Sequence, residues 1–96
     1  MRISLSPVRA DAQLAVELHG DVLTVNGQEF DFTPLPDGAT LPQEAIGSDW
    51  FVSPVERIDG ELRLTLLLPH GPNPPSAVAF PEPITITADG PVELPQ

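Results

Sequence analysis

Residues 22–31 read VLTVNGQEFD, in which two strand-like runs flank the dipeptide Asn26-Gly27. Asn-Gly and Asp-Gly tolerate the positive φ that a tight turn needs, so they are strong local signals for a β-hairpin. The same pattern recurs at Asp59-Gly60 and Asp89-Gly90. Three such dipeptides in 96 residues predict a small antiparallel β protein. They carry no information about chemistry.

The residues around the first turn predict how three strands pair. With Asn26-Gly27 as a two-residue turn, Leu23 lies opposite Phe30. A turn at His19-Gly20 brings Val16 opposite Leu23. In this register one face of the meander is apolar and carries Leu14, Val16, Leu23, Val25, Phe30 and Phe32. The other face carries Glu17, Thr24, Glu29 and Asp31. A one-residue slip would turn these carboxylates inward, so we expect the register to be firmly held.

Proline and glycine divide the rest of the chain into short elements. Its thirteen prolines and seven glycines favour short strands and ordered loops, because proline can neither continue a helix nor donate to a sheet ladder. Further strands are expected at Arg2–Ser6, Trp50–Ile58, Glu61–Leu68, Ala77–Phe80 and Ile84–Ala88. Pro7 is expected to end the first of them, and Phe80 to anchor the fourth.

The second and third turn dipeptides predict two more hairpins. The second places Glu56 opposite Arg63, an opposite-charge pair across the strands. Around the third, a three-residue loop at Asp89-Gly90-Pro91 pairs Ile86 with Leu94. We prefer this loop to a two-residue turn because proline lacks the N–H that would close the shorter one.

A single helical turn is expected over residues 41–46. Thr40 would be its N-cap, and Gly47 would end it. We therefore predict an all-β fold with one domain over residues 1–96. It would be a small antiparallel β-sandwich or open barrel of about seven to eight short strands joined by hairpins, with one short helical turn.

The chain is strongly acidic. Fourteen acidic residues against four arginines and no lysine give a formal charge of −10, and residues 10–56 hold nine carboxylates without any Arg or Lys. This balance argues against binding to nucleic acid or anionic lipid, because phosphate contacts need a basic face. A solubilising surface is the favoured interpretation. The alternative is an acidic inhibitor that mimics nucleic acid and occupies a basic site on a host nucleic-acid enzyme.

Two absences in the sequence narrow the function further. The chain has no cysteine, which excludes disulfides, thiolate catalysis and zinc–thiolate sites. No charged segment leads into an apolar run as in a signal peptide, and the longest apolar run, residues 66–69, is far too short to span a bilayer. We expect a soluble protein without a membrane partner. Its oligomeric state stays open, homo-oligomers included.

The residues that could carry chemistry do not form a recognisable motif. His70 lies in a glycine-flanked loop where a general base could sit, but no nucleophile with a family signature accompanies it. Gly47-Ser48-Asp49 lacks the Gly-x-Ser-x-Gly spacing. A metal site would need both histidines to converge with carboxylates such as Asp21, and no ligand spacing supports this. We assign no catalytic, cofactor-binding or metal-binding residue, and we expect no enzyme and no cofactor.

Trp50, Phe51 and His70 form the candidate interaction surface. Trp50 is the only tryptophan, and Trp50-Phe51 is the only aromatic dipeptide. The pair could contact a partner, or it could anchor the core where the loop rejoins the sheet, and the second role is favoured in a chain so poor in aromatics. Unpaired strand edges are a further surface at which a partner could add a strand, although the prolines also oppose such pairing.

Four stretches that together cover most of the chain resemble a known family. Residues 27–42, 55–62, 67–71 and 84–91 read GQEFDFTPLPDGATLP, VERIDGEL, LLPHG and ITITADGP. They are similar to small, largely uncharacterised prophage-encoded proteins found among phage tail and tail-fibre genes. The resemblance implies a phage-derived protein made in the bacterial cytoplasm, with a place in the virion tail left open. It implies a tail accessory or assembly protein whose partner is a tail or tail-fibre protein, and it brings no catalytic residues.

Overall fold

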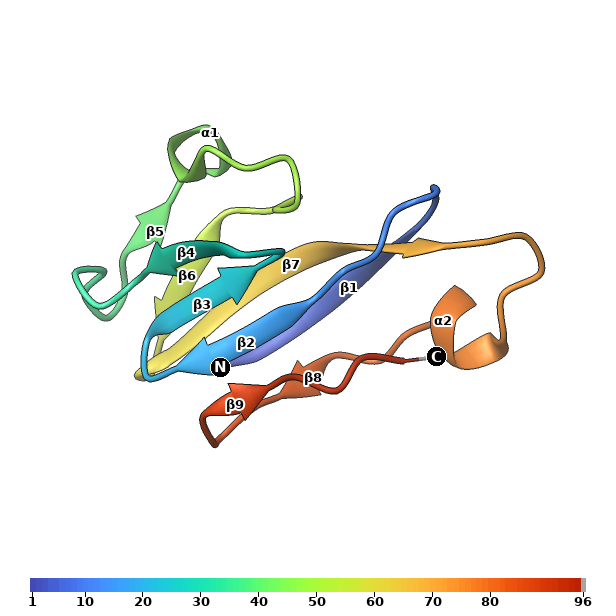
Figure 1. The fold of residues 1–96 in the computed structure, drawn as a ribbon. Coiled ribbons are helices and arrows are strands. Elements are labelled where there is room, and N and C mark those ends of the chain that lie inside the picture. The colour runs from blue at the N-terminus through green and yellow to red at the C-terminus, as the bar shows by residue number, and fades with distance from the viewer. Residues whose placement is uncertain (96) are drawn as a thin grey trace.

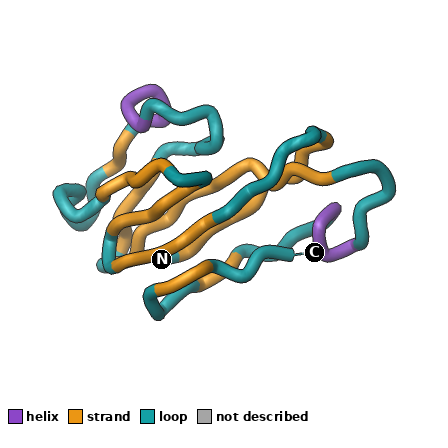
Figure 2. Tube along the Cα trace, in the orientation of Figure 1, coloured by secondary structure: helices purple, strands orange, loops and turns teal. Residues whose placement is uncertain are grey.

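Two facing β-sheets make up the fold in the computed structural model, which describes residues 1–95 (Figure 1). A mixed five-stranded sheet has the order β5-β6-β7-β1-β8, and an antiparallel four-stranded sheet has the order β4-β3-β2-β9. The strands are β1 (Arg2–Arg9), β2 (Val16–His19), β3 (Val22–Val25), β4 (Gln28–Asp31), β5 (Thr40–Leu41), β6 (Val55–Ile58), β7 (Glu61–His70), β8 (Ile84–Thr85) and β9 (Gly90–Pro91). Two short helices, α1 (Gln43–Ile46) and α2 (Ser76–Ala79), interrupt the loops (Figure 2).

This architecture confirms the all-β prediction and makes the fold a sandwich. The described strands number nine rather than seven or eight, and there are two helical turns rather than one. The five-stranded sheet is mixed rather than antiparallel, because β1 and β7 run in the same direction.

One hydrophobic core lies between the sheets. Side chains alternate along each strand, so every second residue faces the other sheet. The five-stranded sheet contributes Ile3, Leu5, Val55, Leu62, Leu64, Leu66 and Leu68. The four-stranded sheet contributes Val16, Leu18, Leu23, Val25 and Phe30, and Phe32 joins them directly after β4. The apolar face predicted for the meander is therefore buried, except that Leu14 is only partly covered.

Two of the predicted hairpins are confirmed in register. Leu23 lies opposite Phe30 across the Asn26-Gly27 turn, whose φ values are 48° and 85°. Glu56 lies opposite Arg63 across the second turn. The facing charges do not form the expected ion pair, because the Nε atom of Arg63 lies 3.4 Å from Oε1 of Glu61 instead.

The turn between β2 and β3 differs from the prediction by one position. The turn residues are Gly20 and Asp21, so Leu18 rather than Val16 lies opposite Leu23. Gly20 adopts a φ of 60°, which glycine does at little steric cost. Each residue pairs two positions away from its expected partner. A shift of two keeps every side chain on its predicted face.

The first strand is longer than predicted and pairs in parallel. β1 continues through Pro7 to Arg9, and Ile3 pairs with Leu64 of β7. On its other side β1 pairs with β8 only at Arg2 and Ile3, so at Pro7 the strand has a paired neighbour, β7, on one side alone. A proline is tolerated at such a position because it has no N–H to contribute to a second neighbour.

The third turn dipeptide does not form a hairpin. β8 pairs with β1, whereas β9 pairs with β2 in the other sheet. Asp89-Gly90 is therefore a corner between the sheets, and the predicted pairing of Ile86 with Leu94 is wrong. The corner is held by a hydrogen bond of 2.9 Å from the backbone N–H of Gly20 to Oδ1 of Asp89.

Both helical segments correct details of the prediction. Thr40 is not an N-cap but a residue of β5, and α1 follows Pro42 without a side-chain cap. Gly47 ends α1 in the left-handed conformation with φ of 76°, as predicted. The segment expected as a strand at Ala77–Phe80 is the helical turn α2 and its C-cap.

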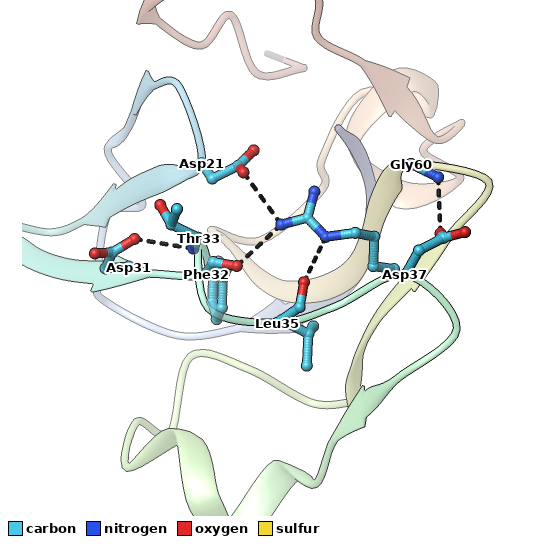
Figure 3. Close-up of polar contacts among 8 residues, drawn as sticks. Asp21, Asp31, Phe32, Thr33, Leu35, Asp37 and Gly60 are labelled. Atoms are coloured by element: carbon cyan, nitrogen blue, oxygen red, sulfur yellow. Dashed lines mark hydrogen bonds and ion pairs between the residues drawn. The ribbon is translucent and has the colours of Figure 1, made fainter.

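Arg57 of β6 connects the five-stranded sheet to the loop that follows β4, and Figure 3 draws its bonds to Phe32 and Leu35 in that loop. Its Nε atom donates to the carbonyl of Leu35 at 2.7 Å, and Nη2 donates to the carbonyl of Phe32 at 3.0 Å. The same loop contacts the next turn through Asp37, whose Oδ1 accepts a hydrogen bond of 2.8 Å from the backbone N–H of Gly60. The two bonds from Arg57 go to loop carbonyls that have no strand partner, and the bond to Asp37 satisfies the backbone N–H of Gly60.

Candidate interaction surface

Phe51 belongs to the core and not to a surface. Its side chain is 0% exposed, and it bridges to Leu66 of β7. Its ring meets Phe30 edge-on at a centroid distance of 4.9 Å and Phe32 at 6.1 Å. Phe51 is therefore withdrawn from the candidate surface, and its role is the core anchor that the sequence favoured.

Trp50 lies half-buried beside β7. Its carbonyl accepts a hydrogen bond of 2.9 Å from the backbone N–H of Leu67, and its own N–H donates to Oγ of Ser48 at 3.2 Å. The strand expected over residues 50–58 is formed only from Val55 onward, since residues 50–52 contact β7 through isolated bonds. Trp50 stays a candidate contact residue.

His70 ends β7, at a separate place from Trp50. Its carbonyl accepts a hydrogen bond of 3.2 Å from the backbone N–H of Ala10. The ring Nδ1 lies 2.8 Å from the carbonyl of Gly71, which fits a donating Nδ1–H. His70 lies three positions beyond the Trp50 contact at Leu67, about 10 Å along a strand. The structure therefore does not bring the three predicted residues together.

The sequence reasoning missed the most exposed aromatic side chain. Phe80 is 81% exposed, and it is the one large hydrophobic side chain so exposed within residues 1–95. It was expected to point inward from a strand. In a strand, Val78 and Phe80 would share a face, but successive helical residues differ by about 100°, so positions two apart point to nearly opposite sides. Val78 is buried at 6% exposure, and Phe80 is consequently turned to solvent.

Local contacts hold Phe80 in place. Val78 fixes α2 to the core, and the backbone N–H of Phe80 donates to the carbonyl of Ser76 at 2.8 Å. Pro81 follows directly and restricts the chain on the other side. The aromatic ring thus projects from a backbone that is held by the hydrogen bond to Ser76 on one side and restricted by Pro81 on the other.

A partly apolar groove of about 900 Å³ lies at one end of the sandwich. It opens where β2 and the C-terminal segment separate, beyond the hydrogen bond of 2.9 Å from Val92 N–H to the Val16 carbonyl. Its walls are formed by Ala12, Gln13, Leu14, Leu68, Pro69, Val92, Glu93, Leu94 and Pro95. The groove adds apolar surface to the end of β7 that carries His70.

The outer face of the four-stranded sheet is acidic, as the predicted register required. Glu17, Thr24 and Glu29 lie opposite one another across three strands, and Asp31 lies on the same face of β4. The Thr33 hydroxyl, together with its backbone N–H at 2.9 Å, lowers the pKa of Asp31. Nε2 of His19 lies 3.6 Å from Oε1 of Glu17.

Neither a metal centre nor a membrane helix is found in the described part of the chain. Within residues 1–95, no three His, Cys, Asp or Glu side chains lie close enough to hold a metal ion. The helices of this part are also too short to cross a bilayer. Comparison of the chain with known protein families, with curated proteins and with solved structures found no significant match in any of the three.

Proposed function

We propose that this chain is a non-enzymatic, phage-derived tail accessory or assembly protein that acts through protein–protein contacts. The observation that carries the proposal is the exposure of Phe80, 81% of which faces solvent. Aromatic side chains bury a large apolar area when a partner covers them, and Tyr, Trp and Phe are enriched at the cores of protein–protein interfaces.

The way Phe80 is held supports the same role. Binding is weakened when flexible groups must be ordered, so an anchor that is already fixed binds at lower entropic cost. The backbone that carries Phe80 is held by the hydrogen bond to the Ser76 carbonyl and by the buried Val78. The partner would be a tail or tail-fibre protein that offers an apolar pocket. This identity rests on the resemblance described for residues 27–42 and the three other stretches.

A tagged pull-down from cells with the parent prophage induced tests the proposal. Wild type and Phe80→Ala would be compared by mass spectrometry, with Gln28→Ala as a matched exposed control on β4. We expect tail or fibre proteins with the wild type and the control, and their loss with Phe80→Ala. The proposal fails if purified tails and assembly intermediates neither contain nor bind the protein.

The acidic sheet face favours a second candidate, an inhibitor that mimics nucleic acid. Glu17, Glu29 and Asp31 share one face, and the chain carries a charge of −10. Such binding would weaken steeply between low and moderate salt, because exposed charges are screened within about 10 Å at 0.1 M. This candidate would be favoured if the wild type captured a host nuclease or polymerase and the double variant Glu29→Gln/Asp31→Asn did not. Capture of the enzyme that is insensitive to salt would count against it.

A further inference from the structure

The two asparagines of the chain differ in the residue that follows them. Asn26 precedes Gly27, and Asn73 precedes Pro74. Both have positive φ, 48° and 56° respectively. The glycine has a backbone N–H that can lose its proton and attack, whereas the proline nitrogen has no proton and is already fully substituted. The chain thus contains a reactive asparagine and an internal control for it.

We propose that Asn26 is a site of spontaneous deamidation and that Asn73 is not. The backbone nitrogen of Gly27 attacks Cγ of Asn26 and forms a new N–Cγ bond. The Cγ–Nδ2 bond breaks, and the side-chain NH₂ leaves as ammonia with the proton that the Gly27 nitrogen gives up. Water then opens the resulting five-membered imide. Opening at Cγ yields aspartate, and opening at the main-chain carbonyl yields isoaspartate.

The surroundings of the turn leave this reaction sterically open. Asn26 and Gly27 are both exposed, and no atom beyond Gly27 and its two chain neighbours lies within 4 Å of the position that a Cβ on Gly27 would occupy. The restraint comes from Ala15. Its backbone N–H donates to Oδ1 of Asn26 at 2.7 Å, and its carbonyl accepts from the Asn26 N–H at 2.8 Å. The first bond holds the carboxamide and the second holds the Asn26 backbone beside Ala15, so we expect the reaction to be slower in the folded chain.

The two products should differ in their effect on the fold. Asp59-Gly60 forms a turn with φ of 51° and 79°, close to the 48° and 85° of Asn26-Gly27. Aspartate at position 26 therefore fits the same turn, and its carboxylate still accepts the bond from Ala15. Isoaspartate adds one carbon to the main chain between β3 and β4, which the two-residue turn cannot accommodate.

Peptide mapping of the aged protein tests the proposal. Trypsin cleaves after arginine and places Asn26 on residues 10–57 and Asn73 on residues 64–96. Folded protein and protein unfolded in urea would be incubated at mildly alkaline pH, which favours the deprotonated attacking nitrogen. Fragmentation would locate each conversion, and Asn26→Asp would serve as the standard for the aspartate product and as a check that it retains the fold.

We expect conversion at Asn26 in both samples, more slowly in the folded one, and none at Asn73 in either. Conversion at Asn73 equal to that at Asn26 would overturn the assignment. So would an Asn26 that stays intact in the folded protein after the unfolded chain has fully converted. Loss of the fold in Asn26→Asp would overturn the claim that the turn accepts aspartate.

Discussion

Nη2 of Arg57 lies 3.1 Å from Oδ2 of Asp21, and this ion pair joins β6 of one sheet to the β2–β3 turn of the other. The Arg57 side chain is only 13% exposed, and it also donates to the carbonyls of Leu35 and Phe32. The guanidinium therefore lies at a junction of three segments that are distant in sequence. Because all its partners are acceptors, an uncharged side chain without donors cannot replace it.

Replacing Arg57 by Met should destabilise the protein by roughly 1–3 kcal/mol, because partly buried carbonyls and Asp21 lose their donor. The free energy of unfolding in urea measures this. Arg63→Met is the matched control, since Arg63 is exposed and its ion pair within residues 1–95 is with Glu61. It should change stability by less than about 0.5 kcal/mol. Equal losses in the two variants would show that Arg57 does not connect the sheets.

Truncation of two phenylalanines should separate the core from the proposed contact residue. Phe51→Ala should cost about 3–5 kcal/mol, because Phe51 is fully buried against Phe30 and Phe32. Phe80→Ala should stay within about 0.5 kcal/mol, because Phe80 lies in solvent. Denaturant unfolding of both variants tests this contrast. A large loss in Phe80→Ala would mean that the ring packs on the protein.

Asp31 should make stability depend on pH in the acid range. The Thr33 hydroxyl and backbone N–H lower its pKa in the folded protein below the ordinary 3.8. The folded state thus favours the carboxylate, and this contribution is present above 3.8 and lost as pH falls through the lowered value. Thr33→Val removes the hydroxyl, so the pKa of Asp31 should rise toward its ordinary value in a carboxyl NMR titration. An unchanged titration curve would contradict the assignment.

Gly60, in the β6–β7 turn, and Gly71, which follows β7, allow a test of backbone strain in that turn. Gly60 has a φ of 79°, and Gly71 does not lie in the left-handed region, although a Cβ on either would meet nothing within 4 Å. Gly60→Ala should therefore cost about 1–2 kcal/mol from backbone strain alone. Gly71→Ala should be nearly neutral. Thermal and urea unfolding would show the difference, and equal effects would contradict a strained turn at Gly60.

The candidate site was harder to predict than the core because exposure depends on the local conformation. Periodicity of two correctly predicted the buried face of the β2–β4 meander, including Leu23, Val25 and Phe30. The same periodicity applied to Val78 and Phe80 gave the wrong side for Phe80, since the segment is helical. The five residues between Pro75 and Pro81 offer too few positions to tell the two periods apart. Trp50, Phe51 and His70 were chosen by residue type, which does not determine their distances.

Local sequence alone was sufficient for the all-β class and for the β3–β4 and β6–β7 hairpins. Turn residues such as Asn26-Gly27 act over a few positions, so the information they carry is read without the rest of the chain. The parallel pairing of β1 with β7 and the separation of β8 from β9 depended on tertiary structure. Ile3 pairs with Leu64 although the two residues are far apart in the sequence. Their pairing depends on the arrangement of strands that buries the apolar faces of both sheets.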